Sequence, residues 1–238
     1  MRTAGLYISS ELPGLLRGNT ADTRTAVEQS ESRRWAFYIL VIICGAGLFG
    51  AAVGSWRAPM QALHTAIKLP LILLITSFGN GLLNAMLAPL FGVNLTPRQS
   101  LFAVLMSFTI AAVILGSFSP LLYFLIWNTS PLVVGASTNA ASHSFVLLCE
   151  TGIIAFAGIA ANVRLLQLLR ELSGSASAAR KVLFAWLAGN LLLGSQLAWM
   201  LRPFVGSPYL EVQFLRPNAL EGNFFEAVFN HAANLFAH

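Results

Sequence analysis

Five long apolar stretches dominate the pattern of hydrophobic and polar positions along this chain. They cover residues 35–56, 67–90, 101–118, 141–161 and 182–201. Each is close to the roughly 20 apolar residues that a helix needs to cross a bilayer. Helices are the expected form, because lipid offers backbone groups no hydrogen-bond partner and the alternation of a membrane barrel is absent. The pattern therefore predicts an all-α integral membrane protein with a bundle of about five transmembrane helices.

The segments outside these stretches differ from them in composition and divide the chain into three parts. Residues 1–34 are polar and are predicted to form a mobile cytoplasmic arm. Residues 35–201 form the five-helix transmembrane domain, and residues 202–238 form an extracytoplasmic tail that contains an amphipathic helix. The third apolar stretch either ends near Phe118 or continues past Pro120 to Trp127, and the sequence leaves both possibilities open.

Two amphipathic segments are expected at the membrane interface. In residues 55–70 the apolar stripe consists of Met60, Leu63 and Ile67, and the polar stripe consists of Gln61, His64 and Lys68. A helix lying along the outer leaflet fits this pattern, and a plain hairpin between two spans fits it about equally well. Lys68 is placed to extend toward the lipid headgroups.

The tail contains the second amphipathic segment. Asn223 followed by Glu226 resembles a capping box. The residues that share one apolar helical face after it are Phe225, Val228, Phe229 and Phe236. This face is expected to lie on the membrane surface or on a partner protein. Residues 202–219 are rich in proline, which predicts an ordered plug against the ends of the spans or, alternatively, a loose tail.

Composition and charge narrow the class of protein. The chain is 56% hydrophobic and 10% charged, with a mean hydropathy of +0.71, whereas soluble domains carry about 25% charged residues. A soluble fold is therefore excluded. The net charge is +5, but the basic residues are scattered, so nucleic acid is not an expected partner.

The distribution of basic residues predicts the orientation. The side that holds the N-terminus has Arg33, Arg34, Arg98, Arg164, Arg170, Arg180 and Lys181, and the other side has Arg57, Lys68, Arg202 and Arg216. Because cytoplasmic loops carry the excess of Lys and Arg, the N-terminus is predicted to be cytoplasmic and the C-terminus extracytoplasmic. A plasma or inner membrane is the expected location.

Polar residues inside the spans are the candidate functional residues. Glu150 lies near the middle of the fourth span, and carboxylates at such depth usually face a bundle interior. The other polar residues assigned to the same layer are Asn80, Asn84, Thr109, His143 and Asn190. One interpretation is a set of interhelical hydrogen bonds in which Glu150 bonds to the amide of Asn80 or Asn190. The other is a proton or ion site.

The first span carries a helix-packing pattern of small residues, formed by Ala46, Gly50 and Gly54. Small residues four apart let two helices approach closely, either within this chain or between two copies. No catalytic, nucleotide-binding or metal-ligating motif is present in the sequence, and Cys44 and Cys149 lie within apolar stretches. No enzyme, cofactor or metal is therefore expected.

The small-residue stretch "CGAGLFGAAVG" and the segment "RAPMQALHTAIKLPLILLI" that leads into the second span resemble the Yip1-like family of five-span membrane proteins. The resemblance covers about residues 35–201. It implies a non-enzymatic membrane organiser, which acts as an adaptor, a scaffold or a subunit of a membrane complex. Its expected partners are the lipid bilayer and other membrane proteins or further copies of itself. The alternative is a small oligomeric transporter or proton-conducting subunit that uses Glu150.

Overall fold

The computed structural model describes residues 13–14, 32–93, 95–129, 139–206 and 211–229, and for residues 139–143 it describes the backbone alone. These ranges contain helices and no strand. The long elements are α3 (Ser32–Ser55), α4 (Pro59–Leu87), the 3-10 helix η1 (Ala88–Phe91), α5 (Pro97–Trp127), α6 (Asn139–Ser173) and α7 (Ala176–Leu201). Five helices, with η1 continuing α4, are long and apolar enough to cross a membrane. The predicted all-α bundle of five such helices is confirmed at this level.

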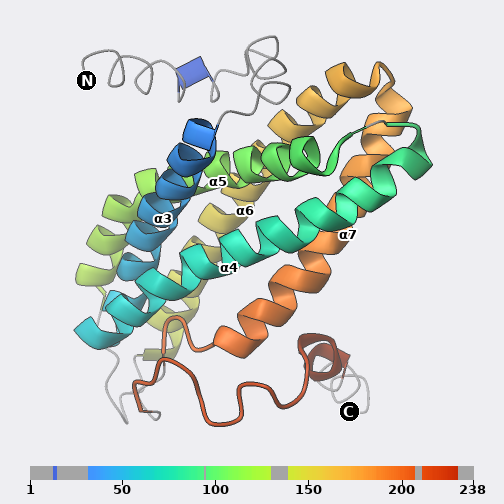
Figure 1. Cartoon of the computed structure of the whole chain (residues 1–238). Helices are drawn as coiled ribbons and strands as arrows, with labels where there is room; N and C mark the ends of the chain where they lie inside the picture. The colour runs from blue at the N-terminus through green and yellow to red at the C-terminus, as the bar shows by residue number, and fades with distance from the viewer. Residues whose placement is uncertain (1–12, 15–31, 94, 130–138, 207–210, 230–238) are drawn as a thin grey trace.

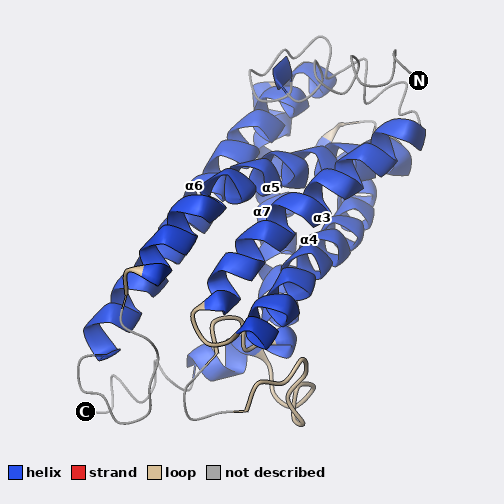
Figure 2. Ribbon diagram, turned by 90° about the vertical axis from the view of Figure 1, so that its left-hand side faces the viewer, coloured by secondary structure: helices blue, strands red, loops and turns tan. Residues whose placement is uncertain are grey.

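The helices form a tight group of three and a looser pair. The first three, α3, α4 and α5, all pack against one another, whereas α6 packs on α5 and α7, and α7 packs on α4 and α6 (Figures 1 and 2). The pair α6 and α7 also buries the smallest share of its residues. The helices α3, α4 and α5 therefore form the packed core of the bundle, while α6 and α7 expose much of their apolar surface.

Glycines on two sides of α3 explain why the first three helices lie so close together. A Cβ atom at Gly50 would collide with the carbonyl of Thr65 in α4, and one at Gly54 would lie 2.5 Å from the carbonyl oxygen of Gln61. On another side, a Cβ atom at Gly45 would collide with the carbonyl of Ala112 in α5. The small-residue face, including the buried Ala46, thus packs inside this chain.

The separate interfacial helix expected over residues 55–70 is wrong. These residues form the first part of α4, which continues unbroken through Pro70. Proline inside a helix removes one N–H donor, and membrane helices tolerate this where neighbouring helices cover the site. Pro70 is buried, and α3 lies alongside this turn at Gly47. Tertiary packing therefore keeps α4 as one helix through this proline.

The helix α5 resolves the question about the third span, because it runs through Pro120 and ends at Trp127. It begins with a capping box in which the backbone N–H of Gln99 donates to Thr96 Oγ1 at 3.2 Å. In return, the backbone N–H of Thr96 donates to Gln99 Oε1 at 3.0 Å. This reciprocal pair satisfies two amides that the first turn leaves without helical partners.

The segment after α7 crosses one end of the bundle. It leaves the lower end of α7, passes beneath the turn between α3 and α4, and returns to a short helix that begins after Asn223 (Figure 1). The start of α3 lies at the opposite end (Figure 1). Contacts described below fasten residues 202–206 to α4, so the predicted ordered plug describes this part of the tail better than a loose tail does.

Candidate functional site

Three asparagines form a closed hydrogen-bond cluster between α4 and α7. The Nδ2 atom of Asn80 donates to Asn190 Oδ1 at 2.7 Å and to the backbone oxygen of Trp186 at 3.0 Å. Asn84 Nδ2 donates to Asn80 Oδ1 at 3.0 Å and to the Asn80 backbone oxygen at 3.0 Å. Gly189 makes the approach possible, because a Cβ atom there would collide with Asn80 Oδ1. Both amide hydrogens of Asn80 are thus engaged, and its carbonyl oxygen is occupied.

The other residues of the predicted polar layer lie apart from this cluster. Thr109 is fully buried, and its hydroxyl donates to the backbone oxygen of Leu105 in its own helix at 2.8 Å. The side chain of His143 lies outside the described part of the chain. The expected bond from Glu150 to Asn80 or Asn190 is not formed: Glu150 Oε1 has no partner among the described residues, and both amide hydrogens of Asn80 are donated to α7. Asn80, Asn84 and Asn190 are thus connected by hydrogen bonds, and Glu150 is not part of their cluster.

Glu150 lies on α6 and is 6% exposed. Its Oε1 atom is buried and has no hydrogen-bond partner among the described residues. A buried polar atom without a partner costs about 1–3 kcal/mol of folding free energy. Glu150 Oε1 therefore forms no hydrogen bond that would stabilise the described bundle.

A small cavity lies among α4, α5, α6 and α7, and several unpaired polar atoms belong to its walls. Its volume is about 190 Å³. The lining residues Thr76, Asn162 and Trp186 each have a buried polar atom without a partner in the described part of the chain, namely Oγ1, Oδ1 and Nε1. These atoms include a donor, an acceptor and a hydroxyl that can do both. The cavity is thus suited to a small neutral molecule that forms hydrogen bonds.

The polar stripe of α4 holds the tail. Gln61 Nε2 donates to the backbone oxygens of Pro203 at 3.0 Å and Phe204 at 2.7 Å, while Thr65 Oγ1 donates to the same Phe204 oxygen at 2.7 Å. Lys68 is fully buried, and its Nζ atom donates to the Pro203 oxygen at 3.0 Å. We call Gln61, Thr65 and Lys68 the tail clasp.

Aromatic rings complete the surroundings of Lys68. Its Nζ atom lies 5.3 Å from the ring centre of Phe214 and 6.0 Å from that of Phe204. A cation over an aromatic face is attracted by the ring quadrupole. His64 also contacts Phe214 edge to face, with 5.4 Å between ring centres. Lys68 therefore binds the tail, and the expectation that it extends to the headgroups does not describe its position.

The orientation of α4 is the reverse of the one expected for a surface helix. Gln61 and Lys68, on the polar stripe, are buried under the tail. Met60, Leu63 and Ile67, on the apolar stripe, are exposed by about half of their surface. An apolar stripe that faces outward is what a lipid-facing helix presents. The sequence pattern was read correctly as amphipathic, but its polar side faces protein rather than water.

Two arginines of the tail gather around one tryptophan at the end of α7. The Cζ atom of Arg202 lies 3.2 Å from the ring centre of Trp199, and that of Arg216 lies 5.3 Å from it. Burial and the charge of Arg216 together lower the pKa of Arg202 from its ordinary value. Arg202 Nε and both Nε and Nη2 of Arg216 are buried without a partner in the described part of the chain. We call Arg202, Trp199 and Arg216 the arginine pair site.

The end of the tail is anchored to α7 as well. The backbone N–H of Phe224 donates to Gln196 Oε1 at 3.1 Å, and Trp199 Nε1 lies 3.4 Å from the backbone oxygen of Glu221, to which it donates. Asn223 caps the following helix, since its Oδ1 accepts from the backbone N–H of Glu226 at 2.7 Å. The Glu226 carboxylate accepts from the Asn223 side chain at 3.3 Å rather than from its backbone.

The predicted docking face of this last helix is open in the described chain. Phe225 is 39% exposed, Val228 is 50% exposed and Phe229 is 72% exposed. Phe236 falls outside the described residues. No described element of this chain covers the face, so the prediction that it lies against membrane or a partner stays a prediction.

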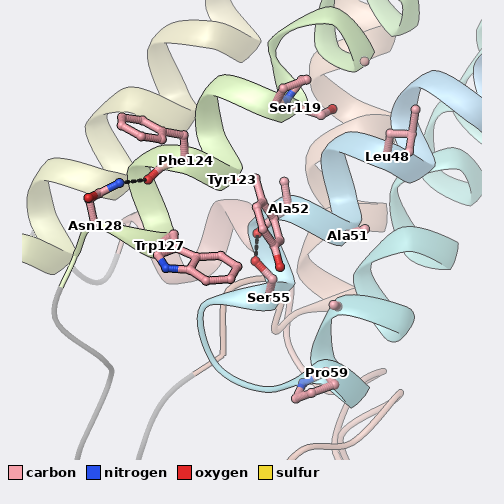
Figure 3. Close-up of a pocket in the computed structure, with 13 residues that line it drawn as sticks. Leu48, Ala51, Ala52, Ser55, Pro59, Ser119, Tyr123, Phe124, Trp127 and Asn128 are labelled. Carbon is pink, nitrogen blue, oxygen red and sulfur yellow. Dashed lines mark hydrogen bonds between the residues drawn. The ribbon is translucent and has the colours of Figure 1, made fainter.

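A wide apolar groove lies between α3, α4 and α5 at the tail end of the bundle. Its volume is about 1080 Å³, and its walls include Leu48, Ala51, Pro59, Ala62, Tyr123 and Trp127. Tyr123 and Trp127 extend from α5 toward α3 and Ser55 (Figure 3). No local pattern indicates this groove, because its walls come from three separate spans, each of which has the composition of an ordinary lipid-facing helix.

The sequence analysis also missed the tail clasp and the arginine pair site. Gln61 and Lys68 were recognised as one polar stripe, but their partners are backbone oxygens more than 130 positions away. Charged and polar residues at such spacing give no local pattern that would reveal a distant carbonyl. The described residues contain no group of three or more His, Cys, Asp or Glu side chains able to hold a metal ion.

No family model, curated protein or solved structure matches this chain. The functional assignment therefore depends on the geometry of these sites.

Proposed function

We propose that the protein is a non-enzymatic polytopic membrane protein that acts as an adaptor, a scaffold or a subunit of a membrane complex. The observation that carries this proposal is the tail clasp. Four hydrogen bonds from Gln61, Thr65 and Lys68 fix the backbone of Pro203 and Phe204 at one end of the bundle. A segment held in this way gives the protein a surface of fixed shape outside the membrane, and such a surface suits the binding of another protein.

The apolar face of the last helix supports this role. Phe225, Val228 and Phe229 are exposed on a helix whose start is fastened to α7 through Gln196 and the cap at Asn223. Large apolar side chains exposed together mark interaction surfaces. We propose that this apolar face binds another membrane protein at the membrane surface. The resemblance to the Yip1-like family agrees with such a role.

The orientation completes the proposal: a cytoplasmic N-terminus and an extracytoplasmic tail, in a plasma or inner membrane. An odd number of candidate spans and the distribution of Lys and Arg support it. In a background where Cys44 and Cys149 are replaced by alanine, single cysteines at Ser10 and at Ala237 are to be labelled with an impermeant thiol reagent. Labelling from opposite sides is expected, and labelling of both from one side contradicts the proposal.

The adaptor role is tested by purifying the full chain in a mild detergent and comparing it with a Phe225→Asp/Phe229→Asp variant. A partner present in a fixed ratio with the unmodified chain should be lost from the variant. Leu220→Asp is the matched control, because Leu220 is 76% exposed but precedes the helix. A chain that purifies alone, or a partner retained by the double variant, contradicts the proposed contact surface.

A second candidate function is a small oligomeric transporter or proton-conducting subunit. Two observations favour it, namely the buried Oε1 of Glu150 without a partner among the described residues and the cavity of about 190 Å³ whose walls hold three unpaired polar atoms. A Glu150→Gln variant keeps the shape of the side chain but cannot exchange a proton. Proton flux into liposomes that contain the purified protein should vanish in this variant if the candidate is correct. Equal flux from both proteins, or none from either, rejects it.

A further inference from the structure

The arginine pair site brings together two positive charges that repel each other, and no carboxylate of the described residues forms an ion pair with them. The described tail has three acids: Glu226 bonds to Asn223, Glu211 accepts from Gln213 at 3.1 Å, and Glu221 meets Trp199 through its backbone oxygen and forms no ion pair. The undescribed residues 207–210 and 230–238 contain no Asp or Glu.

The guanidinium groups nevertheless hold fixed positions. Arg202 stacks on Trp199, whose indole N–H is directed to the Glu221 backbone oxygen. Arg216 lies on the same ring, and the turn that follows it is closed by a bond from the Ala219 N–H to the Arg216 oxygen at 3.1 Å. Stacking on an aromatic face leaves the donors at the edge of a guanidinium free to bind. Three of these nitrogens are buried and unpaired.

Position decides which anion suits the site. Arg202 directly follows the last residue of α7, and α7 is apolar enough to span a membrane up to Leu201. Trp199 stands where tryptophans gather, at the boundary between hydrocarbon and headgroups. The anion that is abundant at this depth is the phosphate of a lipid. The forked donors of arginine match phosphate oxygens in geometry and in charge.

We propose that Arg202 and Arg216, held by Trp199, bind the phosphate group of an anionic membrane lipid at the tail end of the bundle. The bound phosphate lies between two positive charges and relieves their repulsion. Because Pro203, the next residue, accepts the bond from Lys68, the lipid also helps to hold the tail in the position that the tail clasp fixes. The site is separate from the apolar face of the last helix and does not depend on the adaptor role.

The test is a titration of the full chain in a neutral detergent with phosphatidylglycerol, phosphatidylcholine or inorganic phosphate, read by native mass spectrometry. The unmodified chain should bind one phosphatidylglycerol more tightly than phosphatidylcholine. The Arg202→Gln/Arg216→Gln variant should bind it about tenfold more weakly or worse, the change expected from losing a charge-assisted hydrogen bond. The Arg180→Gln/Lys181→Gln variant removes the same charge from exposed positions at the other end of α7 and should bind as before.

Several results would overturn the proposal. Equal binding of phosphatidylcholine, or equal weakening in the control variant, would remove the specificity of the site. Inorganic phosphate that competes at the same concentration would identify a free anion rather than a lipid. Unchanged lipid binding by the glutamine variant, together with loss of a copurified protein, would assign the arginines to a partner's carboxylate. If the glutamine variant does not fold, Arg202→Lys/Arg216→Lys decides: several-fold weaker lipid binding is expected, and unchanged affinity rejects the site.

Discussion

Two ionisable side chains are buried in this bundle, and their surroundings are opposite. Lys68 is fully buried, but it donates to the Pro203 oxygen and faces the rings of Phe204 and Phe214. Glu150 is 6% exposed, and its Oε1 has no partner among the described residues. The comparison teaches that burial alone does not mark a functional group. Lys68 is part of what holds the tail, whereas Glu150 gives the described fold no contact that would explain its presence.

The largest effect is expected from Lys68→Met, which removes the charge-assisted bond to the tail. We expect a loss of about 2 kcal/mol in the free energy of unfolding and faster cleavage of the tail by added protease. The measurement is unfolding in mixed micelles combined with limited proteolysis. Lys181 is the only other lysine and is exposed, so Lys181→Met is the matched control. Equal proteolysis of both variants would show that Lys68 does not hold the tail.

A somewhat smaller effect is expected from Asn80→Leu, which separates the amide cluster from the question of Glu150. The variant removes the bonds that Asn80 makes to the Trp186 oxygen and to Asn190 Oδ1, and it leaves Asn84 Nδ2 only its bond to the backbone oxygen of residue 80, so we expect a loss of about 1–2 kcal/mol. Unfolding in mixed micelles measures it. Asn162→Leu is the control, since Asn162 donates only within α6, to the Gly158 oxygen. A smaller loss from Asn80→Leu than from the control would contradict the bridging role.

The smallest effect on stability is expected at Glu150. The sequence interpretation implies that Glu150→Leu destabilises the bundle by leaving an asparagine unpaired. The structure does not show this pairing, because Asn80 bonds to Asn84 and Asn190, whereas Glu150 Oε1 bonds to no described residue. We expect Glu150→Leu to change the free energy of unfolding by less than about 1 kcal/mol or to raise it, and Glu150→Gln to leave it unchanged. A loss above about 2 kcal/mol from Glu150→Leu would show that the carboxyl group has a structural partner.

Particular residues show which features of the fold could be predicted from the sequence. The pattern of apolar stretches predicted five helices, and the pair Asn223 and Glu226 predicted the start of the last one, because both signals are local. The sequence left open whether the third span ends before Pro120, and the amphipathic segment assigned to the interface ended at Pro70. Both prolines lie inside continuous helices: Pro70 is buried beside α3, whereas Pro120 is exposed on α5.

The candidate sites divide in the same way. Asn80 and Asn84 were expected to share a face because they are one helical turn apart, and they do bond to each other. Their grouping with Glu150 assumed that polar groups at similar depth meet. Depth is fixed by position along a span, but lateral position is fixed by which helices touch. Although α6 packs against α7, which carries Asn190, Glu150 Oε1 forms no hydrogen bond with the asparagine cluster between α4 and α7.

The sequence by itself determined the class of protein, the number of helices able to span a membrane and the polar residues within them. These properties follow from composition and from periodicity over 20 residues or fewer. The tertiary structure decided which polar groups meet: Lys68 with Pro203, Arg202 with Arg216 over Trp199, and Glu150 with no described partner. Such pairs join distant parts of the chain, and their energies depend on distances of 3–5 Å that no local pattern encodes.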